Sequence, residues 1–158
     1  MLQLGLVTGT AGNVSAHAGE LILITPSALP YEEMTVDDLV TLGSDGSVVA
    51  GESEPSSEWR VHVAVYATRP GARALVHTHS EHATAWSELD RPLGRWLTAP
   101  YFPTGTDEIA AAAVAALGDR DAVLLGRHGV LAVGARPAAA LEVCVAVETA
   151  ARRASGIA

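Results

Sequence analysis

The chain has 158 residues, 49% of them apolar and only 4% aromatic, so we expect one domain whose core is built mainly from Ala, Val and Leu. Its net charge is −8, and the scattered arginines argue against nucleic acid or an anionic membrane as a partner. The sequence has neither an apolar stretch long enough to span a membrane nor a cleavable leader, which favours a cytoplasmic location.

The first candidate site is a loop of small residues. Residues 2–7 are apolar, and Thr8-Gly-Thr-Ala-Gly-Asn follows before Val14, a pattern that predicts a strand, a tight loop and a second strand. The glycines of this loop would let backbone amides approach a ligand, and Thr10 and Asn13 add side-chain donors. A plain β-turn between two strands explains the same residues.

The next segments indicate scaffold rather than chemistry. Residues 21–25 form a short aliphatic strand that ends at Pro26. Residues 40–42 and 48–49 flank an Asp-Gly turn, which predicts a hairpin.

Residues 55–69 carry both a strand-like and a helix-like pattern, and we prefer a helix. Ser56 after a proline is a good N-cap, and Arg69-Pro-Gly is a firm stop. The free N–H groups of the helix start, with Ser56 and Ser57, could hold an anion, although two capping serines beside a solvated Glu58 is an equally simple interpretation. His62, like His17, is most simply solvent-facing.

Two histidines separated by one residue follow an apolar run. If residues 75–79 form a strand, His77 and His79 project from the same face. Their imidazoles would converge on one point and suit Zn²⁺ or a similar ion, but one or two further ligands must come from elsewhere.

The rest of the chain supplies a third histidine. Residues 81–89 predict a helix, and residues 91–103, which include Tyr101, predict a loop. A second helix is expected over 107–117 with Thr106 as its cap. Two buried strands follow, over 121–125 and 130–133. His128 lies between these strands and between glycines, so its side chain can point towards a site.

The last predicted element is a helix over residues 137–153. It is apolar almost all round, which suggests burial in the domain or against a partner subunit. Cys144 within it is expected to be a buried, inert thiol.

Five motifs occur in order along nearly the whole chain: Thr-Ala-Gly-Asn-Val-Ser, Leu-Ile-Thr-Pro-Ser, Pro-Ser-Ser-Glu-Trp-Arg, Val-His-Thr-His-Ser and Arg-His-Gly-Val-Leu. In this order they resemble the class II aldolase and adducin family, and most of all its fuculose-phosphate aldolases. The resemblance implies a three-layer α/β/α fold with a central, largely antiparallel sheet. It also implies a single domain over residues 1–158, shortened at the N-terminus and in the 91–103 loop relative to the family.

The resemblance further implies a set of site residues. Zn²⁺, with Mn²⁺ or Co²⁺ as alternatives, would be held by His77, His79, His128 and Glu58. The phosphate of a sugar phosphate would be bound by Thr10, Gly12, Asn13, Ser27, Ser56 and Ser57. Ala28 stands where the family usually has glycine. Family members usually form a four-fold tetramer with active sites between subunits, so a homo-tetramer is expected.

These residue types make chemical sense in a metal-dependent aldolase with Glu58 as the catalytic residue. Retro-aldol cleavage of a ketose 1-phosphate, such as L-fuculose 1-phosphate, to dihydroxyacetone phosphate and an aldehyde requires a stabilised enediolate. A divalent ion chelated by the substrate's oxygens supplies this as a Lewis acid. Glu58 would carry the proton, as a ligand that moves off when the substrate binds. The sequence contains no lysine, which excludes the Schiff-base route.

Other functions on the same scaffold are a pentulose-phosphate 4-epimerase, a methylthioribulose-phosphate dehydratase, a decarboxylase, a non-catalytic adducin-like module and a structural zinc site. Glu58 favours an aldolase over an epimerase, which usually has aspartate there. The retained ligand set disfavours the adducin-like module, and the phosphate-type loops disfavour a structural zinc. The family's aldolases also use tyrosines from the 91–103 region and the C-terminal tail. No tyrosine follows Tyr101 here, so the general acid is left unassigned.

Overall fold

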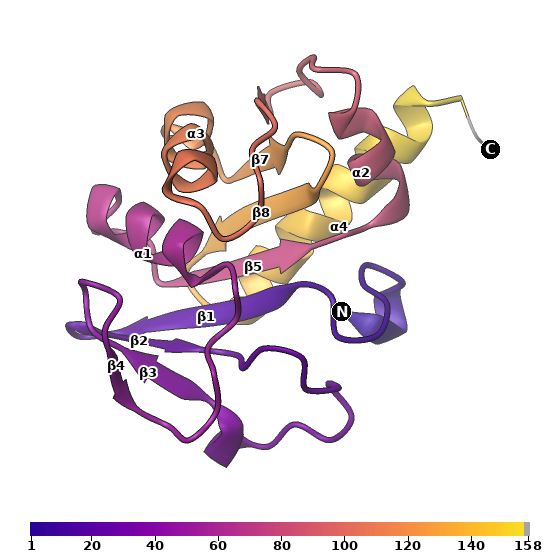
Figure 1. Ribbon diagram of the computed structural model, residues 1–158. Coiled ribbons are helices and arrows are strands. Elements are labelled where there is room, and N and C mark those ends of the chain that lie inside the picture. The colour runs from indigo at the N-terminus through magenta and orange to yellow at the C-terminus, as the bar shows by residue number, and fades with distance from the viewer. Residues whose placement is uncertain (157–158) are drawn as a thin grey trace.

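A computed structural model describes residues 1–156, which build one eight-stranded sheet with helices on both faces (Figure 1). The strand order is β4-β3-β2-β1-β5-β8-β7-β6, and neighbours are antiparallel except for the parallel pair β6 and β7. The strands are β1 (Asn13–Ala18), β2 (Leu21–Ile24), β3 (Val40–Leu42), β4 (Val48–Ala50), β5 (Ala74–Thr78), β6 (Thr98–Ala99), β7 (Ala122–Leu125) and β8 (Gly129–Gly134). The predicted three-layer α/β/α architecture with a largely antiparallel sheet is confirmed.

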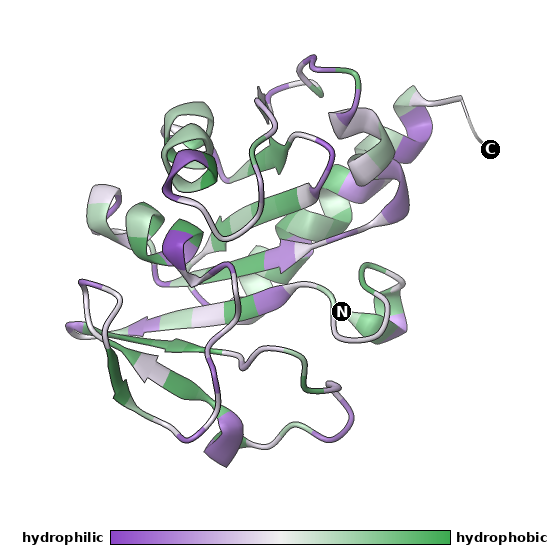
Figure 2. Ribbon diagram, in the orientation of Figure 1, coloured by the Kyte–Doolittle hydropathy of each residue, from purple (hydrophilic) through white to green (hydrophobic). Residues whose placement is uncertain are grey.

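The sheet separates two hydrophobic cores. Helices α1 (Trp59–Thr68) and α3 (Asp107–Leu117) pack on one face, and α2 (Glu81–Ser87) and α4 (Pro137–Ala154) pack on the other. Side chains alternate along a strand, so Leu75 of β5 joins the first core while Val76 joins the second. Strands β7 and β8 and most of β5 are correspondingly hydrophobic, whereas β1 is mixed, and β5 turns hydrophilic towards its C-terminal end, where His77 lies (Figure 2).

Several predicted elements form as their local signals indicate. Helix α3 has the predicted bounds, and the Thr106 hydroxyl accepts a hydrogen bond from the Ile109 amide at 3.4 Å. The Asp-Gly turn joins β3 to β4, with Gly46 in the left-handed region at φ 82°. These elements form where capping and turn residues agree with the hydrophobic pattern.

The prediction of a strand over residues 2–7 is wrong. Residues Leu2–Leu4 form a 3-10 helix that ends at Gly5, and Leu6 and Val7 are buried without pairing with the sheet. The segment is apolar because Leu6 packs into the core under α2 and α4, and burial of a loop gives the same composition as a buried strand.

The start of α1 also differs from the prediction. The N-cap position is Glu58 rather than Ser56, whose hydroxyl accepts a 3.4 Å hydrogen bond from the Glu58 amide. The Ser56 amide donates to the Thr25 carbonyl at 3.1 Å, which holds Ser56 in an extended connection beside β2. Because the helix starts later, Glu58 is its N-cap residue, and the Glu58 side chain contacts Asn13 of β1. The 91–103 segment likewise contains an unpredicted strand, β6.

Helix α4 is apolar along one stripe rather than all round. Ala140, Cys144, Val147 and Ala151 are buried at helical spacing, and the remaining faces are more exposed. Burial raises the pKa of the Cys144 thiol to about 12, in keeping with the predicted inert cysteine. Within residues 1–156, no helix combines the length and the hydropathy needed to cross a bilayer.

Candidate active site

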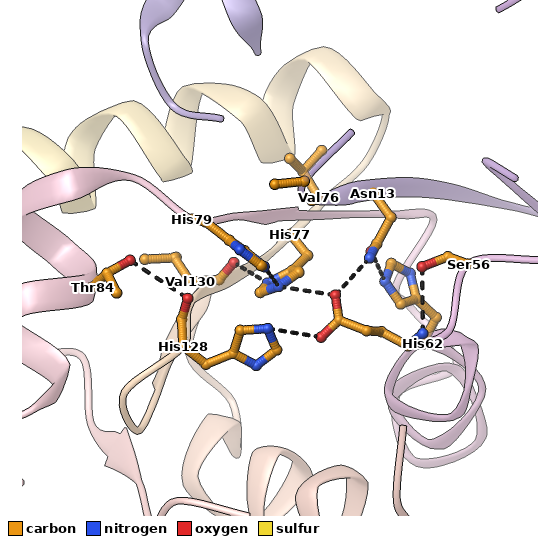
Figure 3. Close-up of polar contacts among 12 residues, drawn as sticks. Asn13, Ser56, His62, Val76, His77, His79, Thr84, His128 and Val130 are labelled. Atoms are coloured by element: carbon orange, nitrogen blue, oxygen red, sulfur yellow. Dashed lines mark hydrogen bonds and ion pairs between the residues drawn. The ribbon is translucent and has the colours of Figure 1, made fainter. Parts of the chain in front are cut away.

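Four side chains that are far apart in sequence meet at one end of the central strands (Figure 3). Glu58 comes from the start of α1, His77 and His79 from the end of β5, and His128 from the turn between β7 and β8. One nitrogen or oxygen of each side chain lies within 4.8 Å of the others. The structure therefore brings together all four residues that the sequence analysis selected as metal ligands.

The local backbone explains how the histidines converge. Strand β5 is flanked by β1 and β8, and its register sets Asn13 beside His77 on one side and Leu131 beside it on the other. His77 Nδ1 lies 2.9 Å from the carbonyl oxygen of Val130, which can only accept, so Nδ1 carries a hydrogen and Nε2 is the ring nitrogen that faces His79 and Glu58. His128 sits at the tip of the β7–β8 hairpin, next to the end of β5.

The donor set fits a divalent cation. His77 Nε2 lies 2.8 Å from His79 Nε2 and 3.1 Å from Glu58 Oε2. His128 Nε2 lies 3.1 Å from Glu58 Oε1, a buried oxygen that no group in residues 1–156 satisfies with hydrogen-bond geometry. Without a metal, a proton on His77 Nε2 holds these mutually repelling nitrogens and oxygens together, and a divalent cation with nitrogen and oxygen ligands can take the place of that proton. A divalent metal therefore suits this group.

The protonation states of the site also suit metal binding. Burial acts to raise the pKa of Glu58, but the positive charge and hydrogen bond of His77, with smaller effects of His128 and His79, hold it well below its usual range. Burial, with repulsion from His77, lowers the pKa of His79 and of His128 to about 4. At neutral pH Glu58 is thus a carboxylate and these two histidines are neutral, which are the metal-binding forms. Burial acts to lower the pKa of His77, but the charge and hydrogen bond of Glu58 raise it, so a metal would bind there with release of the Nε2 proton.

A pocket of about 210 Å³ opens beside the four-residue group. Glu58 and His79 are among the residues that line this pocket. The residues predicted to bind phosphate all line it: Thr10, Gly12, Asn13, Ser27, Ser56 and Ser57. Hydroxyls, an amide and backbone N–H groups dominate the lining, which suits an anion held by hydrogen bonds.

The loop at the base of this pocket is held tightly. Gly12 has φ 75°, and a Cβ added there would lie 2.6 Å from the carbonyl oxygen of His77, so only glycine allows this close approach to β5. The Tyr31 hydroxyl donates to the carbonyl oxygens of Ala11 and Gly12, at 3.1 and 2.8 Å. Burial and the charge of Glu58 raise the pKa of Tyr31 to about 12, so it stays a donor.

The prediction that His62 faces solvent is wrong. Its side chain is completely buried, and its two ring nitrogens lie 2.6 Å from Asn13 Oδ1 and from Ser15 Oγ. The available signal was its spacing of four residues from Glu58, which puts both on one face of a helix turn. Tyr31, the second residue that the sequence analysis missed, has no comparable local signal.

Comparison with known proteins agrees with this arrangement. The sequence pattern of the Class II Aldolase and Adducin N-terminal domain matches residues 1–154. The L-fuculose phosphate aldolase of Escherichia coli O6:H1 is 41% identical over 160 residues, covering 94% of this chain and 74% of that protein. The 5-methylthioribulose-1-phosphate/5-deoxyribulose-1-phosphate aldolase of Rhodospirillum rubrum is 40% identical, covering 92% and 71%.

A solved L-fuculose 1-phosphate aldolase superposes with a TM-score of 0.92 at 33% identity, covering 98% of this chain and 79% of that chain. The matches to the sequence pattern and to the curated relatives extend over nearly the whole chain, and the superposition extends the agreement to the fold. The chain belongs to the class II aldolase and adducin family.

Proposed function

We propose that this protein is a metal-dependent aldolase that cleaves a ketose 1-phosphate, with L-fuculose 1-phosphate as the first candidate, to dihydroxyacetone phosphate and an aldehyde. One observation carries the proposal: the pocket of hydroxyls and amides adjoins the group of one carboxylate and three imidazoles. A phosphate bound in the pocket would place the carbon atoms next to it beside Glu58, and such positioning lowers the barrier to reaction.

We infer that Glu58, His77, His79 and His128 hold the metal, with Zn²⁺ favoured and Mn²⁺ or Co²⁺ as alternatives because imidazole nitrogens predominate. When bound, the metal would act as a Lewis acid on the substrate's carbonyl and hydroxyl oxygens. Thr10, Gly12, Asn13, Ser27, Ser56 and Ser57 would bind the phosphate through hydroxyls and N–H groups.

Glu58 is the proton carrier in this proposal. Its pKa is held low, so it is a carboxylate at neutral pH and can accept a proton from the substrate when the bound sugar displaces it. Asn13 donates to Glu58 Oε2 at 2.9 Å and keeps that oxygen oriented in the resting state. The absence of lysine from the sequence leaves no residue for a Schiff base.

A deoxypentulose 1-phosphate is a second candidate substrate. The Rhodospirillum rubrum relative is named for 5-methylthioribulose 1-phosphate and 5-deoxyribulose 1-phosphate. It is 40% identical to this chain, against 41% for the L-fuculose phosphate aldolase of Escherichia coli O6:H1. Both substrates present the same phosphate and carbonyl to the site and differ at the far end of the sugar. The alternative of an epimerase or dehydratase on the same scaffold predicts a product without a cleaved carbon–carbon bond.

We further propose that residues 1–158 act as a single domain that assembles into a homo-tetramer in the cytoplasm, with active sites at subunit interfaces. Exposed apolar side chains at Val48, Val49 and Tyr101 support burial of part of the surface in an assembly. Light scattering of the purified protein tests this, and a monomer at working concentrations would contradict the assembly.

Metal content tests the metal centre directly. Elemental analysis of the purified protein is expected to find about one divalent ion per chain, as a site with three histidines and a carboxylate predicts. A His77→Ala, His79→Ala double variant should lose this ion. Wild-type protein that keeps full activity after the metal is stripped would overturn the mechanism.

A substrate panel tests the reaction. L-fuculose, L-rhamnulose, L-ribulose and 5-deoxyribulose phosphates would be assayed in parallel for aldehyde release and for epimerisation. We expect aldehyde release from at least one 1-phosphate, and Glu58→Gln to lower kcat by on the order of 10²-fold or more, as for loss of a general base. Epimerised or dehydrated product without cleavage would contradict the aldolase assignment.

A further inference from the structure

Five buried polar side chains form a continuous line that leads away from the candidate metal centre. Their exposed fractions range from 0% to 7%, and the line runs through Glu58, Asn13, His62, Ser15 and Tyr66. His62 Nε2 lies 2.6 Å from Asn13 Oδ1 (Figure 3). Asn13 Nδ2 lies 2.9 Å from Glu58 Oε2, His62 Nδ1 lies 2.6 Å from Ser15 Oγ, and Ser15 Oγ lies 2.8 Å from the Tyr66 hydroxyl. We call these five residues the buried polar network.

The topology explains why these residues meet. Asn13 and Ser15 are two positions apart on β1 and so point to the same face of the sheet, and α1 lies across that face. Glu58, His62 and Tyr66 follow one another at four-residue intervals along α1 and its N-cap, so they form one stripe facing β1. Two polar positions of a strand therefore interdigitate with three polar positions of a helix.

The negative charge of Glu58 decides which group donates and which accepts in every hydrogen bond of the buried polar network. The carboxylate of Glu58 can only accept, so the Asn13 amide nitrogen faces it and Asn13 Oδ1 faces His62. An amide oxygen also only accepts, so His62 Nε2 must carry a hydrogen. Burial, helped by repulsion from His77, lowers the pKa of His62 to about 3, so the ring is neutral and Nδ1 must accept from Ser15. Ser15 in turn accepts from Tyr66.

We propose that His62 is a positioning residue that, as the neutral Nε2–H tautomer, fixes the Asn13 amide with its NH₂ group towards Glu58 and so holds the Glu58 carboxylate in place. If the Asn13 amide were rotated by half a turn, its oxygen would face the Glu58 carboxylate and its NH₂ group would face His62. The hydrogen on His62 Nε2 excludes this orientation, because that hydrogen needs an acceptor and an NH₂ group is a donor. This role rests on the proposed function, in which Glu58 is a metal ligand and the proton carrier.

Buried outer partners of metal ligands commonly tune affinity, and their loss costs about 10-fold to 100-fold in metal binding. His62 does not contact the metal ligand Glu58 through a hydrogen bond of its own, but acts on it through Asn13, one hydrogen bond further from the metal. Its effect should therefore appear in metal affinity and in kcat, and, because Asn13 also lines the phosphate pocket, in KM. A network that served only folding would change thermal stability and leave the other quantities unaltered.

The first test reads the tautomer of His62 in the wild-type protein loaded with Zn²⁺. Long-range ¹H–¹⁵N correlation spectra of the histidine rings at neutral pH distinguish a protonated Nε2 from a protonated Nδ1, and a His62→Gln spectrum assigns the signal. We expect a neutral ring with hydrogen on Nε2. A ring with hydrogen on Nδ1, or on both nitrogens, would overturn the proposal, and this measurement needs no variant activity.

The second test compares His62→Leu with His62→Gln. Zinc affinity is measured by competition with a chromogenic chelator, and kcat and KM are measured on the substrate that the panel identifies. We expect His62→Leu to bind zinc about tenfold more weakly and to lose kcat, with a higher KM because the Asn13 amide also faces the phosphate pocket. His62→Gln keeps an N–H donor for Asn13 and should recover most of both losses.

His82→Gln is the matched control, since His82 is a half-buried histidine of α2 outside the network. It should leave zinc affinity and kcat unchanged. Wild-type zinc affinity in His62→Leu, or a loss that His62→Gln does not recover, would contradict the role of His62. Inactivity of the wild type on every sugar phosphate would instead refute the proposed function, while the tautomer and the zinc affinities would still decide the role of His62.

Discussion

Ala28 occupies a backbone conformation that glycine adopts more easily, at the rim of the phosphate pocket. Its φ is 57°, in the left-handed region, and it is one of the residues that line the pocket. The left-handed conformation costs an L-residue about 1–2 kcal/mol, whereas glycine loses about 0.5–1 kcal/mol more backbone entropy on folding. We therefore expect Ala28→Gly to raise the free energy of unfolding by about 0.5–1 kcal/mol.

Urea unfolding of Ala28→Gly beside Ala111→Gly provides the comparison. Ala111 is exposed within α3, where a glycine should destabilise by about 1 kcal/mol. Equal destabilisation by the two glycines would show that Ala28 carries no conformational strain.

Tyr31 contributes to the phosphate pocket without lining it, through its two hydrogen bonds to the Ala11 and Gly12 carbonyls. Tyr31→Phe removes both bonds and keeps the ring. Because a hydrogen bond contributes about 0.5–1.5 kcal/mol, we expect KM for the phosphate substrate to rise roughly 2-fold to 10-fold while kcat changes less. Steady-state kinetics on the panel substrate measure both. An unchanged KM with a large loss of kcat would instead place Tyr31 in the chemical step.

At the scale of single elements, the turn between β7 and β8 determines where His128 lies. Gly129 has φ 155°, and a Cβ added there would overlap the backbone carbonyl oxygen of Thr78 at the end of β5. Gly129→Ala should therefore displace the hairpin from β5, move His128 away from His77 and His79, and lower the free energy of unfolding by about 1–3 kcal/mol. Zinc affinity should fall with it.

Gly71→Ala is the control for that substitution, because an added Cβ at Gly71 meets no atom within 4 Å and its φ is not in the left-handed region. Denaturant unfolding and chelator competition on both variants give the result. If Gly129→Ala binds zinc as the wild type does, the close approach of the two strands does not set the position of His128.

Elements with local signals could be predicted from the sequence, and elements defined by distant contacts could not. Helix α3 has its Thr106 cap and Gly118 stop within the segment itself, so its bounds follow from residues 106–118. Strand β6 exists only because Thr98 and Ala99 pair with β7, some 26 residues later, and nothing in residues 91–103 indicates that partner. The apolar residues 2–7 predict burial correctly, but burial alone does not distinguish a strand from a packed loop.

At the scale of the whole molecule, the sheet assembles the site from four separate segments of the chain. The His77 and His79 pair follows from strand alternation, His128 follows from its place between two glycines and two strands, and Glu58 as a ligand was implied by the family resemblance. The buried position of His62 could not be predicted, because its partners Asn13 and Ser15 lie 49 and 47 residues away and are brought to it by the packing of α1 on β1. The tetramer and the cytoplasmic location stay predictions.

The burial of His62 links global stability to pH. Burial, then repulsion from His77, lowers its folded-state pKa to about 3 against the attraction of Glu58, whereas an unfolded histidine titrates near 6.5. As the pH falls below about 6.5, His62 takes up a proton in the unfolded state, but in the folded state it stays neutral until about pH 3. The free energy of unfolding therefore falls as the pH is lowered from about 6.5 towards 3. The limiting slope for one such group is about 1.4 kcal/mol per pH unit.

We expect the free energy of unfolding of the wild type, minus that of His62→Gln, to fall by about 1.4 kcal/mol per pH unit between about pH 6 and pH 4, because glutamine does not titrate. Both proteins are measured by urea unfolding in the same chelating buffer, so that release of metal does not contribute. Taking the difference cancels the other histidines and the carboxylates, which the two proteins share. Parallel pH profiles would mean that His62 has the same pKa in the folded and unfolded states, which would contradict its being held neutral by burial below pH 6.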